Sequence, residues 1–354
     1  MARKENIESL DLLLRDLCDP DVVFGGKVVV FGGDFRQVLP VVPHRTQNEA
    51  VEASLVSSTL WPTFTRYSLT ENMRAREDQQ FSDFLLNLGN GCLQTAEVEF
   101  VEVPPQIVLA TDPNGNSVND LVENVFPEIS VGPFSNDFFT DRAILTPMNE
   151  DVDGLNNDLI ARFPGEAVIY KSFDMILDDS CNMYPSEFLN TLCPGGMSPH
   201  ELVLKENNPV ILLRNLAPAA GLCNGTRLVC KRFLPNIIEC VIITGHHKGD
   251  TVFLPRINLR PSISANYPFQ FQRKQFPIKL SFAMTVNKSR GQTLNQVGLY
   301  LHRPCFSHGQ LYVGLSHARK SSKVKVLSSS STQEQPHSVK NVISFKVLAK
   351  AGII

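Results

Sequence analysis

The segment GGKVVVFGGDFRQVLPVV, residues 25–42, decides the fold class that the sequence predicts. Its apolar residues 28–31 are followed at once by a polar group that contains Asp34, Arg36 and Gln37. A short apolar run without alternation predicts a strand that is buried on both faces, as in a parallel sheet. Ligands of open parallel sheets bind beyond the carboxyl ends of the strands, so these polar residues are candidates for a site.

The chemistry of this polar group suits a phosphate or a bound water. Gly32 and Gly33 allow close backbone approach or a positive φ. Asp34 and Gln37 bring an acceptor and an amide near one another, a combination that positions a water or a terminal phosphate in several NTPases. An ordinary exit from a strand, with Asp34 capping the next turn, explains the same residues. Local chemistry alone leaves both interpretations open.

Length and composition indicate a globular protein of two or three domains, because the chain has 354 residues of which 43% are hydrophobic. No apolar run approaches the roughly 20 residues that span a bilayer, so no membrane partner is expected. The N-terminal segment is predicted to be an amphipathic helix over 5–17. The eight cysteines include no C-x-x-C pair, which favours reduced thiols, and we expect no metal site.

Charge is distributed unevenly along the chain. Residues 1–200 carry a net charge of −19, whereas residues 201–354 carry +16. The basic C-terminal part is typical of a surface that faces a polyanion. Attraction between the two halves explains the asymmetry equally well.

Periodicity and turn residues predict the order of elements. Gly89 is expected to close a helix over 77–88, and a Pro- and acid-rich connection is expected over 96–140. Short β-like runs separated by Gly, Asn and Pro turns indicate a small antiparallel barrel within residues 183–270. The remaining predictions are a strand at 143–145, a helix from Asn149, a strand at 297–301, a helix at 308–317, a strand at 323–328 and a C-terminal tail that is either a docked helix or loose.

Three further motifs accompany GGDFRQVLPVV in a fixed order: LTENMRA at 69–75, FAMTVNKSRGQTL at 282–294 and GQLYVGLSHARK at 309–320. With them the chain resembles the petite-integration-frequency (PIF) DNA helicases of superfamily one over nearly its whole length. The segments YPSEFLNTL, NPVILLRNLAPAAGLCNGTRL and NKSRGQT look like the plant and Helitron-transposon branch.

The resemblance implies an α/β protein with two RecA-like P-loop NTPase folds and an inserted small antiparallel β-barrel. The implied boundaries are 1–92 for an incomplete first RecA-like domain, 138–182 with 276–354 for a largely complete second one, and 183–275 for the barrel. In this family the two RecA-like domains close on ATP, and single-stranded DNA crosses their upper surface.

Residue roles follow from the motifs. The resemblance implies that Gln37 senses the γ-phosphate of ATP, that Arg74 contacts the same phosphate, and that Asp34 is the third catalytic residue. A permanently charged guanidinium suits this role because it stabilises charge spread over phosphoryl oxygens. The alternative for Arg74 is a surface ion pair with a neighbouring glutamate. Gly33 is expected to approach the nucleotide.

The basic loop after residue 284 matches the segment that touches DNA and nucleotide. Its expected DNA contacts, with one from the barrel, are Thr285, Lys288, Ser289, Arg290 and Arg227. Gly291 and Gln292 are expected to bind nucleotide at a turn into a helix, where backbone N–H groups suit an anion. A solvated basic loop and a structural brace are the alternatives for the loop and the barrel.

Two departures from the family pattern bear on activity. No Gly-Lys-[Ser/Thr] step occurs, although a phosphate-cradling loop needs one, and the family's acidic Mg²⁺ ligands are also lacking. The chain looks like a family member that begins downstream of these Walker A and Walker B motifs. In addition, His317 takes the place of the family's arginine finger. Arg319 is assigned to nucleotide binding, although two residues correspond to about 200° around a helix.

The expected function is therefore an ATP-dependent DNA helicase by resemblance, with 5′-to-3′ polarity and a role in repair, recombination or transposition. We expect the polypeptide alone to be inactive, although ATP and Mg²⁺ are the family's cofactors. The alternatives are a non-catalytic, single-stranded DNA-binding remnant of a Helitron-type helicase and an inert product. The resemblance further implies an intracellular, nuclear protein.

Overall fold

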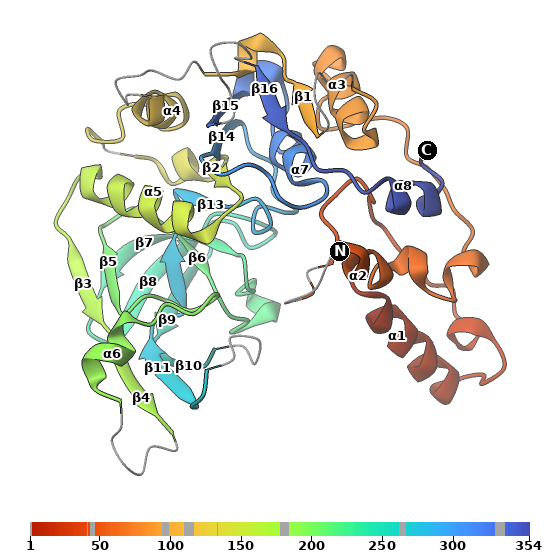
Figure 1. Cartoon of the computed structure of the whole chain (residues 1–354). Helices are drawn as coiled ribbons and strands as arrows, with labels where there is room; N and C mark the ends of the chain where they lie inside the picture. The colour runs from red at the N-terminus through yellow and green to blue at the C-terminus, as the bar shows by residue number, and fades with distance from the viewer. Residues whose placement is uncertain are drawn as a thin grey trace. The chain divides into compact units, whose positions relative to one another are not determined.

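The computed structural model describes residues 2–40, 42, 47–93, 99–109, 117–132, 134–177, 184–261, 267–329 and 337–354. The chain divides into two compact units (Figure 1). Unit 1 comprises Met1–Ala110, Arg303–Val324 and Ser328–Ile354, and unit 2 comprises Thr111–His302 with Lys325–Leu327. Among the described residues, no helix combines the length and the apolar character needed to cross a lipid bilayer.

Unit 1 is mainly helical. Its elements are α1 (Lys4–Leu17), α2 (Gln47–Glu52), α3 (Gln79–Asn90), α7 (Gln310–Ser316), α8 (Phe345–Ala351) and the antiparallel pair β1 (Phe100–Glu102) and β16 (Ser338–Lys340). A small core joins Leu39, Val51 and Val56 to Val347 of α8. The C-terminal tail is thus a docked helix, which settles the choice that the sequence left open.

The predicted strand at 28–31 is not formed, and this prediction was wrong. Residues 27–34 adopt neither helix nor strand, and the side chains of Val28 and Val30 are 95% and 88% exposed. A strand is buried on both faces only where neighbouring strands and covering helices exist. In the described part of unit 1, β1 and β16 pair with each other and leave this run without a strand partner.

Two further boundaries differ from the prediction. Helix α3 continues through Gly89 and ends at Asn90, and Gly91 caps it in the left-handed conformation that favours glycine. The expected connection at 96–140 contains β1 and the helix α4 (Ser117–Val125). Leu121, Val122 and Val125 are buried there, so an apolar face exists within a stretch that looked like loop because of its prolines and acids.

Unit 2 contains a four-stranded sheet that brings the basic loop to one edge. The strand order is β13 (Ala283–Thr285), β2 (Arg142–Thr146), β14 (Gln296–Leu301) and β15 (Val324–Ser328), and β2 is parallel to both β13 and β14. Helices α4 and α5 (Asn149–Arg162) pack on this sheet. Gly298 permits the close approach of α4, since a Cβ atom there would lie 2.8 Å from Val125.

The rest of unit 2 is antiparallel. One sheet has the order β12 (Ile278–Leu280), β6 (Pro209–Leu212), β7 (Arg227–Phe233), β8 (Ile237–Ile242) and β9 (Thr251–Pro255). A second has the order β10 (Ile257–Leu259), β11 (Phe271–Gln275) and β4 (Phe173–Ile176), beside α6 (Ser186–Thr191), and β3 (Val168–Lys171) pairs with β5 (Glu201–Leu204). Antiparallel strands were expected here, and their closure into a barrel stays a prediction.

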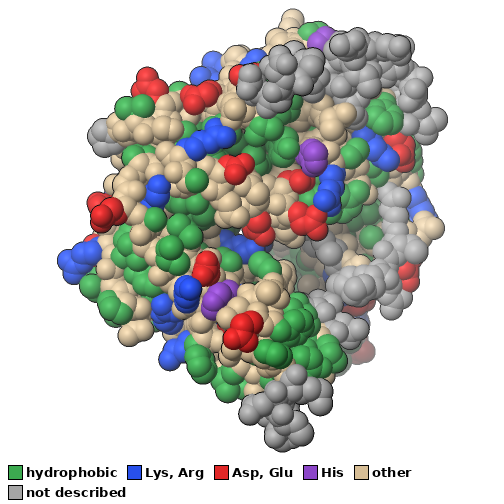
Figure 2. All heavy atoms as spheres, turned by 60° about the vertical axis from the view of Figure 1, so that its left-hand side comes forward, with side chains coloured by type: hydrophobic (Ala, Val, Ile, Leu, Met, Phe, Trp, Pro, Cys, Tyr) green, Lys and Arg blue, Asp and Glu red, His purple; other side chains and the backbone are tan. Residues whose placement is uncertain are grey.

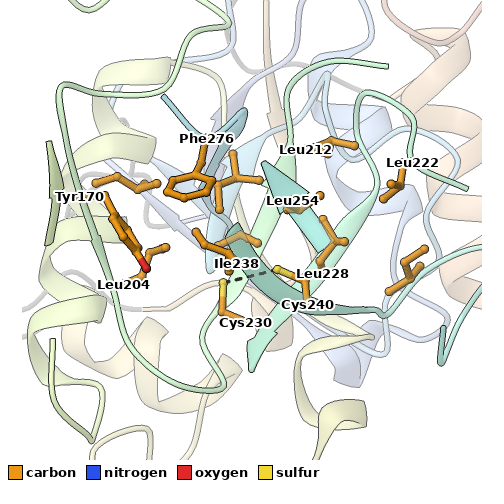
Figure 3. Close-up of a cluster of buried hydrophobic side chains, with 14 residues drawn as sticks. Tyr170, Leu204, Leu212, Leu222, Leu228, Cys230, Ile238, Cys240, Leu254 and Phe276 are labelled. Atoms are coloured by element: carbon orange, nitrogen blue, oxygen red, sulfur yellow. Dashed lines mark hydrogen bonds between the residues drawn. The ribbon is translucent and has the colours of Figure 1, made fainter. Parts of the chain in front are cut away.

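The five-stranded sheet and the β3–β5 pair share one apolar core, drawn in Figure 3, whereas the sheet of β10, β11 and β4 packs on a separate buried cluster. Tyr170 and Phe276 meet edge to face in it, with ring centroids 4.9 Å apart. Cys230 of β7 and Cys240 of β8 lie opposite each other in the register, and their Sγ atoms are 4.0 Å apart. The core fixes the turns between the strands, and these turns form part of the site described below.

Candidate nucleotide sensor and nucleic-acid groove

The polar residues after 28–31 make contact with α7 of unit 1. The Tyr312 hydroxyl donates a hydrogen bond of 2.9 Å to the Asp34 carboxylate. The other carboxylate oxygen accepts the backbone N–H of Arg36 at 3.0 Å, which closes a tight turn. Asp34 therefore both shapes its own loop, as the alternative interpretation held, and joins that loop to a helix nearly 280 residues away.

Arg36 extends this connection to α3. Its Nε atom donates to the Asn90 side chain at 2.6 Å. Gly89, one residue earlier, lies so close that a Cβ atom would be 2.8 Å from Cδ of Arg36 and 3.0 Å from the Tyr312 ring. The glycine that we predicted as a helix cap instead lets α3 approach this polar cluster.

Arg74 reaches the same helix. Its Nη1 atom donates to the backbone carbonyl of Ser316 at 2.8 Å, and the Asn72 side chain accepts the backbone N–H of Arg74 at 3.1 Å. Tyr312 and Ser316 are one helical turn apart and lie on the same face of α7. Asp34 and Arg74 thus contact neighbouring positions of one helix, and their expected convergence on a phosphate stays a prediction.

Burial and neighbouring charges alter the proton affinity of this cluster. Burial lowers the pKa of Arg74, and the nearby charge of Arg319 lowers it further. Burial raises the pKa of Tyr312, and the charge of Asp34 raises it further. Tyr312 therefore stays a neutral donor. Helix α7 ends at Ser316, and the argument that placed Arg319 on the far side of a helix was therefore wrong.

Tyr312 is the functional candidate that the sequence analysis missed. It donates a hydrogen bond to Asp34, and the charges of Arg36 and Arg74 lie close enough to affect its pKa. Its position within GQLYVGLSHARK, the motif already singled out, was the available signal. We use the name sensor cluster for Asp34, Arg36, Arg74 and Tyr312.

The start of α7 is packed against the backbone of Gln37. Gly309 has a φ of +72°, and a Cβ atom on it would lie 2.1 Å from the Arg36 carbonyl oxygen and 3.0 Å from the Gln37 carbonyl carbon. The adjacent His308 donates from Nε2 to the Phe35 carbonyl at 2.8 Å and accepts the Ser344 N–H at Nδ1. The loop that carries Gln37 is therefore tied to α7 and to the C-terminal segment.

Gly33 does not have the geometry that we expected. Neither Gly32 nor Gly33 has a positive φ, and a Cβ atom on either would meet no atom within 4 Å. The close backbone approach occurs instead at Gly309. Gly33 keeps its expected nucleotide role only as a prediction.

Unit 2 contains a groove of about 770 Å³ between three turns. The turns are 218–226 before β7, 244–247 after β8 and the basic loop 287–292. Lys288 bridges two of them, because its Nζ atom donates to the Asn224 side chain at 2.9 Å. We use the name basic groove for this cavity, whose lining includes Lys288, Arg290, His246 and His247.

The basic groove holds cations that are partly withdrawn from water. Burial lowers the pKa of Lys288, and the nearby charge of Arg214 lowers it further. Burial likewise lowers the pKa of Arg290. Clustered cations with reduced hydration gain more from meeting an anion than solitary ones do. The groove is therefore suited to a phosphate-bearing ligand.

Two of the five predicted DNA contacts are buried. Arg227 is 0% exposed, and its guanidinium donates to the carbonyl oxygens of Arg142 and Ser281 at 3.1 and 3.0 Å. Ser289 is also buried, and its hydroxyl donates to the Val286 carbonyl. Both side chains organise the backbone around the sheet, so the surface roles predicted for them do not fit this structure.

The other residues of the loop are placed as follows. Thr285 is the half-buried last residue of β13, and its carbonyl accepts the backbone N–H of Lys288. Gly291, with a φ of +79°, and Gln292 line the basic groove. The turn leads to strand β14, and the prediction of a helix after it was wrong.

Among the described residues, no three His, Cys, Asp or Glu side chains gather in a way that could hold a metal ion.

Surface charge does not form one large field on the face seen in Figure 2. There, Lys and Arg side chains alternate with acidic and hydrophobic ones. The basic groove is one place where positively charged side chains of the C-terminal part gather.

The parallel sheet of unit 2 and the loops at its edge form a RecA-like α/β fold, and comparisons show which known proteins the chain resembles. A PIF1-like helicase model matches residues 1–99, and a model of the 2B domain of DNA helicase Pif1 matches residues 187–233. The ATP-dependent DNA helicase PIF1 of Xenopus laevis is 26% identical over 340 residues, which cover 92% of this chain and 45% of that protein. These matches show that parts of the chain are similar to PIF1-like helicases.

Other relatives and solved structures show the same similarity. The rat ATP-dependent DNA helicase PIF1 is 32% identical over 184 residues, which are 50% of this chain and 26% of that protein. The structure of Pif1 helicase from Candida albicans has a TM-score of 0.60 at 22% identity, over 99% of this chain and 74% of that one. Bacteroides Pif1 bound to single-stranded DNA gives 0.64 at 20%, over 99% and 72%. The chain spans less than half the length of the curated relatives named here.

Proposed function

We propose that this chain supplies the single-stranded DNA-binding and γ-phosphate-sensing parts of an ATP-dependent DNA helicase. The observation that carries the proposal is the basic groove, which Lys288 and Arg290 line and in which Lys288 contacts Asn224. Phosphate contacts dominate the affinity of proteins for nucleic acid, and partly desolvated cations in a groove provide such contacts.

Relatives support the proposed ligands. One similar solved structure is Bacteroides Pif1 bound to single-stranded DNA, and another is Bacteroides Pif1 with ADP-AlF3 and single-stranded DNA, with a TM-score of 0.65. By analogy, the sensor cluster would meet the terminal phosphate of ATP through Arg74, with Gln37 on the neighbouring loop. Arg319 lies close enough to Arg74 to affect its pKa and is the remaining candidate for an arginine finger.

We further propose that residues 1–354 alone do not hydrolyse ATP at a helicase rate. The sequence has no Gly-Lys-[Ser/Thr] step, and His317 replaces the arginine expected at that position. Mg²⁺ and a cradle lysine normally stabilise the charge that develops during phosphoryl transfer. The proposed role of this polypeptide is therefore DNA binding, and 5′-to-3′ unwinding belongs to an assembly that supplies the cradle.

The finer assignments are also proposals. The segment NKSRGQT and the turn LCNGT support a place in the plant and Helitron-transposon branch. Activity in DNA repair, recombination or transposition, in the nucleus, follows from that placement. A non-catalytic remnant that retains single-strand binding is the second candidate function, and the basic groove supports it equally.

Titration of a fluorescent single-stranded oligonucleotide at two salt concentrations tests the DNA role. We expect affinity to fall steeply with salt and Lys288→Ala to reduce the logarithmic salt slope by about 0.7, the value for one single-strand phosphate contact. Lys171→Ala is the matched control, since it removes the same charge from β3, outside the groove. Equal effects of both substitutions, or no binding at low salt, would contradict the proposal.

Phosphate release tests the prediction about turnover. We expect no DNA-stimulated release from ATP by the purified polypeptide in the presence of Mg²⁺. Release that disappears in Arg74→Ala would show that hydrolysis occurs without the cradle motif, and the proposed division of roles would then be wrong.

A further inference from the structure

Four aromatic side chains gather beside α6 and the start of β11, in the lower part of unit 2 in Figure 1. The rings of Tyr184 and Phe269 have centroids 4.6 Å apart, Tyr184 stacks on Phe188 at 5.8 Å, and Tyr267 stacks on Phe269 at 5.7 Å. We use the name aromatic platform for these four residues. They form a connected surface of π-systems on one unit.

The platform packs on a buried cluster, and three of its rings are half-buried while Phe188 is exposed. Tyr184 and Phe269 pack against a buried cluster that includes Met197, Leu259 and Phe271. Phe188, at the edge, is 42% exposed. Rings held by a core lose little conformational entropy when a ligand stacks on them. An exposed ring of this kind is a ready surface for another flat group.

A line of cations connects the platform with the basic groove. Arg214 donates to the carbonyl oxygens of Gly196 and Arg260, at 2.7 and 3.1 Å, and Gly196 precedes Met197 of the supporting cluster. The charge of Arg214 also lies close enough to Lys288 to lower the pKa of that lysine. Arg260 is exposed, and its Nε atom donates to Gln272 of β11 at 3.2 Å.

Among the described residues, the two acidic side chains near the platform differ in their access to a ligand. Asp174 is fully buried in an ion pair with Arg273, with a separation of 2.7 Å. Glu187 of α6 is exposed next to Phe188 and is the acidic neighbour that a ligand would meet. Flat rings beside a row of cations match the two faces of a single strand, which offers bases on one side and phosphates on the other.

We propose that the aromatic platform stacks unpaired nucleobases of the same DNA strand whose phosphates occupy the basic groove. Arg214 and Arg260 contact the phosphates between the two places. The inference rests on the proposed DNA role and adds to it a base-dependent part of the affinity. Stacking tolerates any base, so the site selects for single-strandedness and not for sequence.

Two oligonucleotides of equal length test this site, a poly-dT strand and the same backbone with abasic residues. We expect wild-type protein to prefer the strand with bases, and Phe188→Ala and Tyr267→Ala each to weaken binding of poly-dT by about fivefold or more. Binding of the abasic strand should not change. Phe188→Trp should restore the affinity, because the larger ring keeps the stacking surface.

Controls separate this site from the groove and from misfolding. Phe253→Ala removes a phenylalanine that is also exposed, on β9 outside the platform, and should leave both affinities unchanged. Lys288→Ala should weaken binding of both strands. If neither strand binds to wild-type protein, the proposed DNA role itself fails. If both strands bind equally well and the platform variants behave like Phe253→Ala, the platform alone is refuted.

Discussion

Tyr312 and Asp34 are separated by 278 positions in the sequence, and their side chains form a hydrogen bond of 2.9 Å within unit 1. This bond holds the loop that carries Gln37 against the helix whose end accepts the Arg74 guanidinium. The two hydrogen bonds thus connect the loop and Arg74 to the same helix. The relationship makes Tyr312 the first residue to test.

Tyr312→Phe should destabilise unit 1 by about 1–2 kcal/mol, because the substitution removes a hydrogen bond to a carboxylate and leaves the ring in place. Urea unfolding measures the change. Tyr300→Phe removes a hydroxyl from a half-buried tyrosine in unit 2 and serves as the control. A loss of stability in Tyr300→Phe as large as in Tyr312→Phe would argue against a special role for the bond with Asp34.

Gly309→Ala should destabilise the protein by at least about 2 kcal/mol. The new methyl group would lie 2.1 Å from the Arg36 carbonyl oxygen, and the residue would also keep a positive φ that alanine disfavours. Gly154→Ala provides the matched contrast, since Gly154 lies within α5 with open space around its Cβ position. There we expect a gain of about 0.5–1 kcal/mol. Thermal unfolding of both variants tests whether Gly309→Ala loses stability and Gly154→Ala gains it.

Stability should fall as the pH drops below about 6.5 because of His308. Burial lowers the pKa of this histidine in the folded protein, while the unfolded chain keeps the ordinary value of about 6.5. Above pH 6.5 both states are neutral and the full stability is present. Below it the unfolded state binds a proton first, and stability declines until the folded pKa is reached.

Denaturation at pH 7.5, 6.5 and 5.5 measures this dependence. His308→Gln should lower stability at pH 7.5, because glutamine does not reproduce both bonds to Phe35 and Ser344. The variant should also show a weaker decline between pH 6.5 and 5.5. A decline of unchanged steepness would assign the pH dependence to other groups.

Arg227→Ala should reduce stability and leave intrinsic DNA affinity intact. The substitution would remove a buried guanidinium and strand the carbonyl oxygens of Arg142 and Ser281, at a cost of about 3 kcal/mol or more. Arg232→Ala, at a side chain 71% exposed, should change stability by less than about 0.5 kcal/mol. Melting temperature and oligonucleotide affinity, measured below the melting range of both variants, separate the two effects.

The sequence correctly predicted those elements whose apolar pattern lies within one short stretch of the chain. Helix α1, helix α5 and strand β14 have the apolar spacing that their structures use, and they lie within one or two residues of the expected ranges. Asp34 and Arg74 were found from motifs, and both contact α7. The motifs also predicted a resemblance to PIF1-like helicases, and the comparisons show similarity to that family over residues 1–99 and 187–233.

The predictions that failed concern residues whose structure depends on contacts with distant parts of the chain. The pattern of residues 28–31 is that of a buried strand, but burial requires partners that no local window contains. Tyr312 and Gly309 owe their roles to contacts with residues some 270 positions away. Arg227 was expected to contact DNA from the family resemblance, whereas its buried guanidinium donates to the backbone carbonyls of Thr140, Arg142 and Ser281.

The run KVVVF at residues 27–31 has a practical consequence for anyone who purifies this polypeptide. Uncharged β-branched side chains that stand in water form cross-strand ladders readily with copies of themselves. Concentrated solutions should therefore form β-rich assemblies through this run. A lysine in place of Val30 should keep the molecules dispersed without touching the Asp34–Tyr312 bond.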